Sequence, residues 1–379
     1  MKIKSKKIPL KEVATFLNGY AFKPSDWSKE GLPIIRIQNL TGTNKEFNYY
    51  NGDYNEKYII EDGDILISWS ASLGIFLWKN ITGILNQHIF KVIFDKDIET
   101  DKLYFLHCMK YLIKKIEKNI HGSTMKHITR PEFEKINFPI YNIDIQRKIA
   151  KKLVFISEII DNNKRILVKL MDLSKSLFTT MFGDPLLNDK KEWNFFKIKN
   201  IGKIISGSTP STNISEYWNG EYLWITPAEL NDDSFIINST NRKLTYLGVK
   251  TSSLIELPIG TVLLSSRAPI GKVAIVGENM FCNQGFKNII PNEKINSIYL
   301  YYVFKEKKEY LNFLGRGATF KELSKEIVEN ISIKVPPIEL QNKFAERIEK
   351  IEKLKFEIEK SIETAQNLYD SLISKYFDN

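Results

Sequence analysis

Two polar segments of the chain share residue types and order. They are HGSTMKHITR, from His121 to Arg130, and RGATFKELSK, from Arg316 to Lys325. Each begins with a glycine turn and continues with hydroxyl-bearing and basic side chains, which bind phosphates and hydrogen-bond to base edges. We predict phosphate or groove contacts by Lys126, Arg130, Arg316, Lys321 and Lys325. The alternative is that each glycine turn only starts a structural strand or helix.

Further polar residues lie near the ends of predicted strands, where a side chain can reach a base edge. The candidate base readers of the first half are Arg36, Gln38, Asn39, Trp69 and Ser70. Those of the second half are Thr226, with Glu229 nearby, Ser266 and Arg267. The dipeptide Asn-Gln occurs in both halves, at 86–87 and 283–284. If the two halves recognise different nucleic-acid sequences, the residues that they share are expected to be structural or to contact the sugar–phosphate backbone.

Motifs of enzyme chemistry are incomplete in this sequence. Phe313-Leu-Gly-Arg-Gly matches the FxGxG pattern of a methyl-donor pocket, but no Asn/Asp-Pro-Pro-aromatic motif accompanies it. No GxxxxGK[S/T] phosphate loop is present, and the four histidines lack metal-ligand spacing. We therefore expect no catalytic residue, no metal site and no cofactor in this chain.

Composition indicates a soluble protein and is compatible with an anionic partner, although a composition rich in Lys, Asn and Ile also arises from an AT-rich genome. The 379 residues suit two domains, and 55 basic against 45 acidic residues leave a net charge of +10. Only two cysteines occur, at unrelated positions, as expected in a reducing compartment. The N-terminus lacks a signal-peptide core, and no apolar run approaches a membrane span. We expect a cytoplasmic location and no membrane partner.

A long internal repeat organises the chain. Gly122 and Lys126 return as Gly317 and Lys321, and 317 − 122 = 195. Upstream, Gly63 returns as Gly260, and 260 − 63 = 197, so a small length difference lies between. A duplication of this length indicates two similar structural units. The expected fold is α+β, with many short strands in each unit.

Each copy of the repeat ends in a long amphipathic helix. Apolar residues follow a heptad pattern from about Ile145 to Phe182, and the same register recurs 195 residues later. The predicted seam of the first helix is Ile149, Leu153, Ile156, Ile160, Leu167, Leu170, Leu177 and Met181. The predicted seam of the second is Phe344, Ile348, Ile351, Ile358, Ile362, Ala365, Leu372 and Tyr376. An intramolecular antiparallel coiled coil is expected, with the two units related by an approximate two-fold.

At this point the whole chain resembles the specificity subunit of type I restriction–modification systems. The resemblance rests on the repeat, on LSKSLF (173–178) with LYDSLI (368–373), and on SSRAPIG (265–271) followed by NQGF (283–286). It implies target recognition domains at 1–143 and 185–338, joined by spacer helices at 144–184 and 339–379. Each domain of that family reads one half of a split, asymmetric DNA sequence.

The resemblance also implies the partners. These are double-stranded DNA, two methyltransferase (M) subunits, and restriction/translocase (R) subunits. S-adenosylmethionine, ATP and Mg would be used by those subunits, so that this chain is not itself an enzyme. A coiled-coil scaffold with two protein-binding heads is the alternative, and a self-contained methyltransferase is disfavoured by the missing motifs.

Overall fold

The computed structural model describes residues 5–44, 46–69, 73–79, 81–120, 129–187, 193–252, 254–267, 269–315 and 322–378. The chain divides into two compact units. Unit 1 comprises residues 1–164 and 359–379, and unit 2 comprises residues 165–358. Each unit therefore contains part of both long helices, and each is described here by itself.

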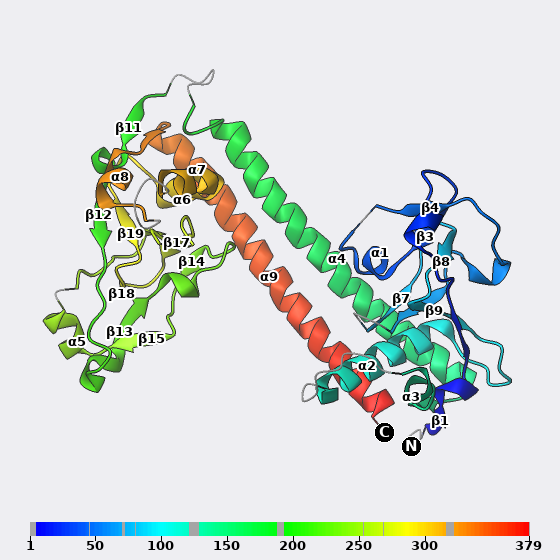
Figure 1. The fold of residues 1–379 in the computed structure, drawn as a ribbon. Helices are drawn as coiled ribbons and strands as arrows, with labels where there is room; N and C mark the ends of the chain where they lie inside the picture. Colours follow the sequence, from blue (N-terminus) through cyan, green and yellow to red (C-terminus); the bar gives the residue numbers. More distant parts are fainter. Residues whose placement is uncertain are drawn as a thin grey trace. The chain divides into compact units, whose positions relative to one another are not determined.

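The two long helices are α4 (Ile143–Phe182) and α9 (Ile338–Phe377), each of 40 residues. At 1.5 Å per residue each is about 60 Å long. They pair in antiparallel fashion within each unit, as predicted (Figure 1). In unit 1, the Asn163 amide donates a hydrogen bond to Ser361 Oγ (3.1 Å), and in unit 2, Arg347 Nη1 lies 3.9 Å from Met181 Sδ. Every predicted seam residue is buried or half-buried.

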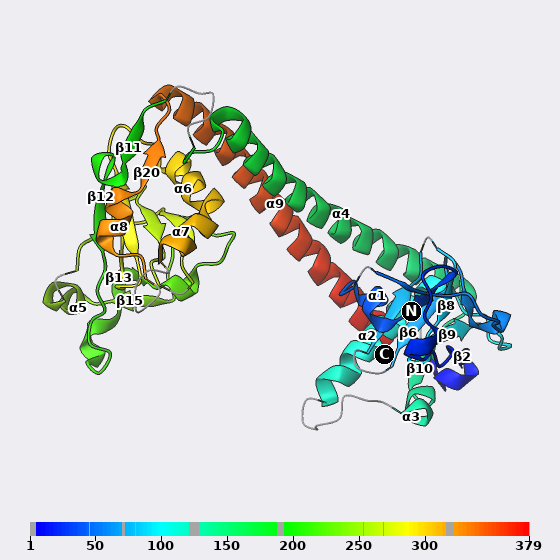
Figure 2. The same ribbon diagram turned by 45° about the horizontal axis from the view of Figure 1, so that its top comes forward.

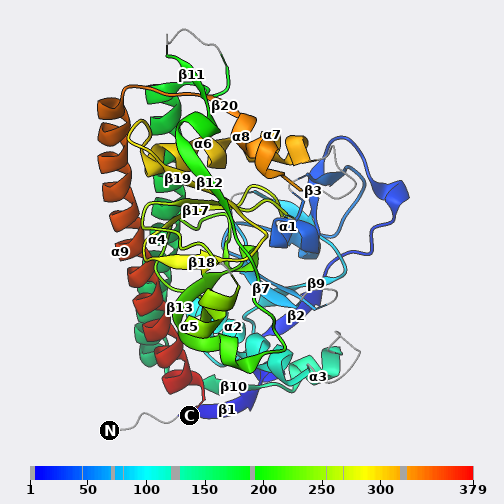
Figure 3. The ribbon, with the colours of Figure 1, turned by 90° about the vertical axis from the view of Figure 1, so that its left-hand side faces the viewer.

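Unit 1 contains two four-stranded sheets and a two-stranded ribbon. The first sheet, in spatial order, is β2 (Thr15–Asn18), β9 (Ile89–Ile93), β6 (Ile65–Ser68) and β7 (Gly74–Leu77). The second is β4 (Asn48–Tyr50), β3 (Leu32–Ile35), β8 (Gly83–Leu85) and β5 (Ile59–Ile60). The ribbon pairs β1 (Lys6–Pro9) with β10 (Asn137–Ile140), as Figure 3 shows.

Unit 2 also contains two sheets and a ribbon, and the strands that both units share follow the same spatial order. Its first sheet is β12 (Gly202–Ser206), β19 (Lys287–Pro291), β16 (Val262–Leu264), β17 (Val273–Val276) and β14 (Ile236–Ile237). Its second is β15 (Arg242–Leu244), β13 (Trp218–Ile225) and β18 (Met280–Cys282). Its ribbon pairs β11 (Phe195–Lys197) with β20 (Ser332–Lys334), seen in Figure 2.

Short helices complete both units. Those of unit 1 are α1 (Ile37–Thr41), α2 (Lys102–Ile120), α3 (Arg130–Glu134), η1 (Leu10–Glu12), η2 (Pro24–Asp26) and η3 (Glu56–Tyr58). The α-helices of unit 2 are α5 (Tyr246–Thr251), α6 (Ser297–Glu306), α7 (Lys308–Leu314) and α8 (Lys325–Asn330). Its 3-10 helices are η4 (Ile198–Asn200), η5 (Ser215–Tyr217) and η6 (Pro227–Glu229).

The same local signals start equivalent elements in both units. Gly63 and Gly260 precede β6 and β16 with φ of 85° and 86°, a backbone conformation that favours glycine. Both strands are apolar and buried, and so they form the centre of each first sheet. The expectation of two similar α+β units is confirmed.

Each unit's core includes both long helices. In unit 1, Ile149 and Leu153 of α4 and Phe377 of α9 pack in one cluster with residues of α2 and the first sheet. In unit 2, Phe178 of α4 and Ile348 of α9 occupy the corresponding cluster. The long helices are thus part of each folded unit, because their apolar faces complete its core.

Candidate nucleic-acid interface

A shared backbone junction joins the two sheets within each unit. The Asn86 N–H donates to the carbonyl of Ile35 at the end of β3 (3.1 Å). The Asn283 N–H donates to the carbonyl of Ile225 at the end of β13 (3.1 Å). These equivalent bonds are made by the backbone of the repeated Asn-Gln dipeptides, and a structural role for their side chains stays a prediction.

A glycine at the end of the neighbouring strand allows this junction to close. A Cβ added to Gly19 would lie 2.2 Å from the Leu85 carbonyl oxygen. A Cβ added to Gly207 would lie 2.0 Å from the Cys282 carbonyl oxygen. Only glycine fits at either position, and so both units bring the ends of the same strands to one place.

The turn that follows the junction is also common to both units. The Arg36 N–H donates to Asn39 Oδ1 (3.0 Å), and the Thr226 N–H donates to Glu229 Oε1 (2.9 Å). The Asn39 amide additionally donates to two backbone carbonyls, those of residues 44 and 46. Asn39 and Glu229 therefore cap their turns, which commits their side chains to the protein.

Arg36 and Gln38 remain as the polar groups of the unit 1 turn. The Arg36 guanidinium donates to Asn48 Oδ1 (2.5 Å) and lies 5.1 Å from the centre of the Trp27 ring. Its Nε is buried and has no hydrogen-bond partner among the described residues. The half-buried Gln38 side chain likewise makes no hydrogen bond to another described residue.

Aromatic and basic side chains of unit 1 meet beside the junction. The Trp69 ring stacks on Phe90, with 5.6 Å between centroids and 19° between planes. The Arg130 guanidinium lies 5.9 Å from the centre of the Phe90 ring. Its Nε donates to Glu134 Oε1 (2.7 Å) and its Nη1 to Asn18 Oδ1 (3.4 Å). The structure thus brings Trp69 and Arg130 together over one buried ring.

Unit 2 has different chemistry at the equivalent positions. Phe90 pairs with Asn18 in the β2–β9 register, and Lys287 pairs with Ser206 in the β12–β19 register. Lys287 therefore occupies the place of Phe90. Its ammonium contacts Ser266 Oγ (3.4 Å) and Glu322 Oε1 (3.3 Å). An ionic cluster replaces an aromatic one on the same scaffold.

The remaining sequence-predicted residues of unit 2 differ in their exposure. Ser266 is fully buried, so its side chain supports Lys287 from within. Arg267 is exposed and forms an ion pair with Glu322 (3.1 Å). Lys325 starts α8 and is exposed, with Glu329 Oε1 at 3.6 Å, as Arg130 starts α3 beside Glu134. Four predicted residues lie outside the described part of the chain: Ser70, Lys126, Arg316 and Lys321.

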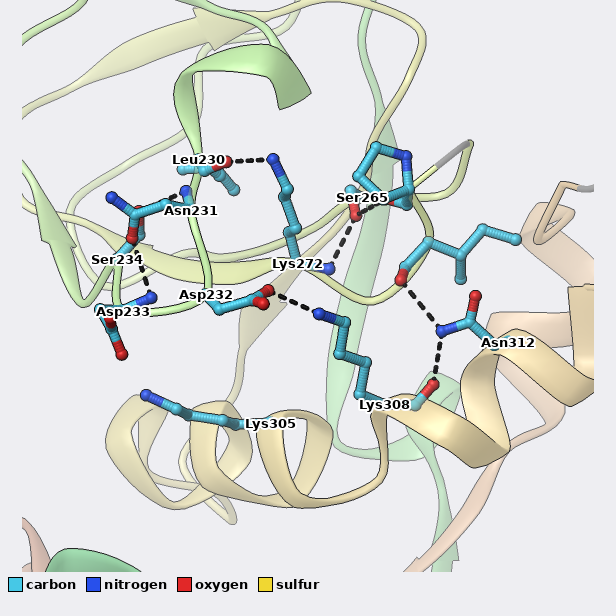
Figure 4. Close-up of polar contacts among 12 residues, drawn as sticks. Leu230, Asn231, Asp232, Asp233, Ser234, Ser265, Lys272, Lys305, Lys308 and Asn312 are labelled. Atoms are coloured by element: carbon cyan, nitrogen blue, oxygen red, sulfur yellow. Dashed lines mark hydrogen bonds and ion pairs between the residues drawn. The ribbon is translucent and has the colours of Figure 1, made fainter. Parts of the chain in front are cut away.

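Lysines anchor the segment that follows the unit 2 turn. Figure 4 shows the Lys272 ammonium at the carbonyl of Leu230, directly after η6. Lys308 of α7 binds Asp232 at 2.5 Å, and this bond lowers the pKa of the Asp232 carboxyl. Thr226 and its turn are thus held from both the first sheet and the helices. Lys272 was not singled out from the sequence, because a lysine at the start of a strand has no distinctive pattern.

Potential metal ligands and thiols are scattered or buried among the described residues. Within the described ranges, no group of three or more His, Cys, Asp or Glu residues is placed to hold a metal ion. Burial raises the pKa of the Cys108 thiol and raises that of Cys282 to about 12. The part of the chain that the structure describes also contains no helix with the length and apolarity needed to cross a bilayer.

Two copies of a two-sheet domain, with matching junctions and different residues at equivalent positions, define a modular protein built from two similar units. The model of the type I restriction modification DNA specificity domain matches residues 2–171 and 190–365. The chain therefore belongs to this family, whose members determine DNA target recognition in type I systems.

Several relatives support the assignment. The MjaIX specificity subunit of Methanocaldococcus jannaschii is 48% identical over 158 residues, which cover 41% of this chain and 37% of that protein. The EcoBI specificity subunit of Escherichia coli is 23% identical, over 98% of this chain and 85% of the relative. The crystal structure of the S subunit from M. genitalium covers 99% of this chain and 96% of its own, with 14% identity and a TM-score of 0.67. That structure shares the fold.

Proposed function

We propose that this chain selects a bipartite, asymmetric DNA target, with unit 1 reading one half-site and unit 2 the other. One observation carries the proposal. Equivalent positions of a repeated scaffold hold Phe90 in unit 1 and Lys287 in unit 2, and each contacts a different charged side chain, Arg130 in unit 1 and Glu322 in unit 2. A common scaffold supplies the same approach to the duplex, whereas different side chains contact different base edges.

Charge supports a duplex as the partner. The net charge of +10 favours a polyanion. An exposed basic residue begins the equivalent helix in each unit, Arg130 in α3 and Lys325 in α8. Such residues neutralise phosphates and set the register of a protein on DNA without specifying its sequence.

Catalysis belongs to partner subunits in this proposal. Two methyltransferase (M) subunits and the restriction/translocase (R) subunits dock on this chain, and they use S-adenosylmethionine, ATP and Mg. Large apolar side chains on the long helices suit protein contacts, because they are exposed in the single chain. In unit 1 they include Phe155 and Leu368, and in unit 2 Val168, Met171, Leu354 and Phe356.

Methylation mapping tests the proposal. The chain is expressed with its co-encoded methyltransferase in a host free of adenine methylation, and modified adenines are located by single-molecule sequencing. The expected result is one split, asymmetric motif that disappears when this chain is omitted. A soluble complex without any motif would contradict the proposal and favour a scaffold with two protein-binding heads.

A further inference from the structure

A chain of polar contacts runs from the core of unit 2 to its surface. Ser266 Oγ lies 3.4 Å from Lys287 Nζ, which lies 3.3 Å from Glu322 Oε1. Glu322 Oε2 lies 3.1 Å from Arg267 Nε. Side-chain exposure rises along this series of contacts, from 9% at Lys287 to 29% at Glu322 and 51% at Arg267.

Backbone contacts join the segment of Ser266 and Arg267 to the segment of Glu322. The Leu323 N–H donates to the Ser266 carbonyl (2.9 Å), and Arg267 and Glu322 form an antiparallel bridge. The carboxylate is therefore fixed by the buried ammonium on one oxygen and holds the guanidinium on the other. Among the described residues, the Arg267 guanidinium makes this ion pair through Nε, which leaves the pair of Nη groups on the far side of the fork from the carboxylate.

Stability does not account for this arrangement. An exposed ion pair such as Arg267–Glu322 contributes little to folding, and burying the Lys287 ammonium carries a desolvation penalty. Unit 1 builds the same sheet with Phe90 in place of Lys287, so the fold itself does not require a charge there.

We propose that Arg267 reads a guanine in the half-site of unit 2, and that Glu322, anchored by Lys287, is the positioning residue that aims its guanidinium. This assignment rests on the proposed function. Paired Nη donors match the O6 and N7 acceptors of guanine in the major groove, and a guanidinium fixed in advance loses less entropy on binding.

The test starts from the motif of the unaltered chain in complex with its methyltransferase. The half-site read by unit 2 contains a guanine, and Arg267→Ala makes that single position degenerate. Discrimination against other bases there falls by about 5- to 150-fold, while the first half-site stays unchanged. Lys169→Ala serves as the control, because it removes an exposed positive charge of α4 that lies outside the proposed interface and is expected to leave the motif intact.

Three further measurements separate base reading from other roles. Replacing the guanine by 7-deazaguanine, which lacks N7, weakens binding of the unaltered complex but not of Arg267→Ala. Arg267→Lys keeps the positive charge and still loses discrimination, because it lacks the fork held by Glu322. Glu322→Gln reduces the penalty for 7-deazaguanine at an unchanged stoichiometry of the complex, an effect that a purely structural role would not produce.

Each contrary outcome is distinct. A unit 2 half-site without guanine on either strand, or an unchanged motif in Arg267→Ala, overturns the assignment and leaves the proposed function standing. Full activity of Arg267→Lys with uniform weakening of Arg267→Ala on all sequences identifies a phosphate contact instead. Absence of any motif for the unaltered chain contradicts the proposed function, and this assignment with it.

Discussion

Gln341 repeats, in unit 2, all three hydrogen bonds that Gln146 makes in unit 1. Its Oε1 accepts from the Asn296 N–H (2.8 Å), and its Nε2 donates to the carbonyls of Lys294 (3.1 Å) and Pro336 (2.7 Å). Gln146 makes the matching three bonds at 2.8–3.0 Å. Both side chains are fully buried. Each glutamine therefore ties the start of a long helix to the segment that leads into the helix covering the first sheet.

Gln341→Ala is expected to destabilise unit 2 by roughly 2–4 kcal/mol, because it removes three hydrogen bonds to backbone groups, of which the bond to the Pro336 carbonyl is buried and the other two are partly buried. Thermal unfolding of the full chain, followed by circular dichroism, measures the effect. Lys343→Ala is the control, because Lys343 is exposed and lies in the same turn of α9 as Gln341. Equal melting temperatures for the two variants would contradict a structural role for the glutamine.

His107 makes the stability of unit 1 depend on pH. Burial, with a smaller effect of Lys110, lowers the pKa of its imidazole from 6.5 to about 4, and its Nδ1 lies 2.7 Å from Tyr369 Oη. Between pH 4 and 6.5, His107 is therefore protonated in the unfolded chain but neutral in the folded unit. The free energy of unfolding should therefore fall, by up to about 3 kcal/mol, as the pH drops from 6.5 to 4.

Urea titrations at several pH values measure this dependence. His107→Gln should flatten the curve between pH 6.5 and 4, because the replacement does not titrate. The interpretation fails if His107→Gln and the unaltered chain lose stability in parallel.

Lys325 is expected to contact a phosphate rather than a base. Lys325→Ala should weaken binding to all duplexes alike and reduce the slope of log K against log salt by about 1, because one fewer counterion is released. Fluorescence anisotropy between about 50 and 200 mM salt measures the slope, because the affinity for DNA falls steeply over this range. Exposed Lys169 of α4 provides a control. A change in the methylated motif would instead assign Lys325 to base reading.

The length of the paired helices is expected to set the spacer between the half-sites. One heptad inserted after Asn163 and another after Ser361 preserves both seams, since these residues contact each other within unit 1. Each helix lengthens by about 10 Å, or about 3 base pairs. Methylation mapping should return both half-sites with a longer spacer. An unaltered spacer with an intact complex would show that the helices do not determine it.

The sequence predicted the architecture well, because the repeat at a constant offset states the same fold twice. It also predicted the seams and the strands, because the apolar periodicity that marks them is local. It could not rank the polar candidates. Ser266 and Arg267 are adjacent in sequence, yet one is fully buried and the other exposed.

Besides Lys272, sequence reasoning missed Lys287 and Glu322. Lys287 lies in an apolar strand, where a single lysine normally points to solvent, and its burial depends on Glu322 from a distant segment. One signal could have found it. At the offset of 197 that aligns Gly63 with Gly260, Lys287 falls on Phe90, so a charge replaces an aromatic ring inside an otherwise matching strand.

The most direct test of the account exchanges one recognition domain. Residues 1–143 are replaced by the corresponding domain of a family member with a known motif, and methylated adenines are mapped with the same methyltransferase. One half-site is expected to change to that of the donor, while the other half-site and the spacer stay the same. A change in both half-sites, or in neither, would contradict independent reading by two units.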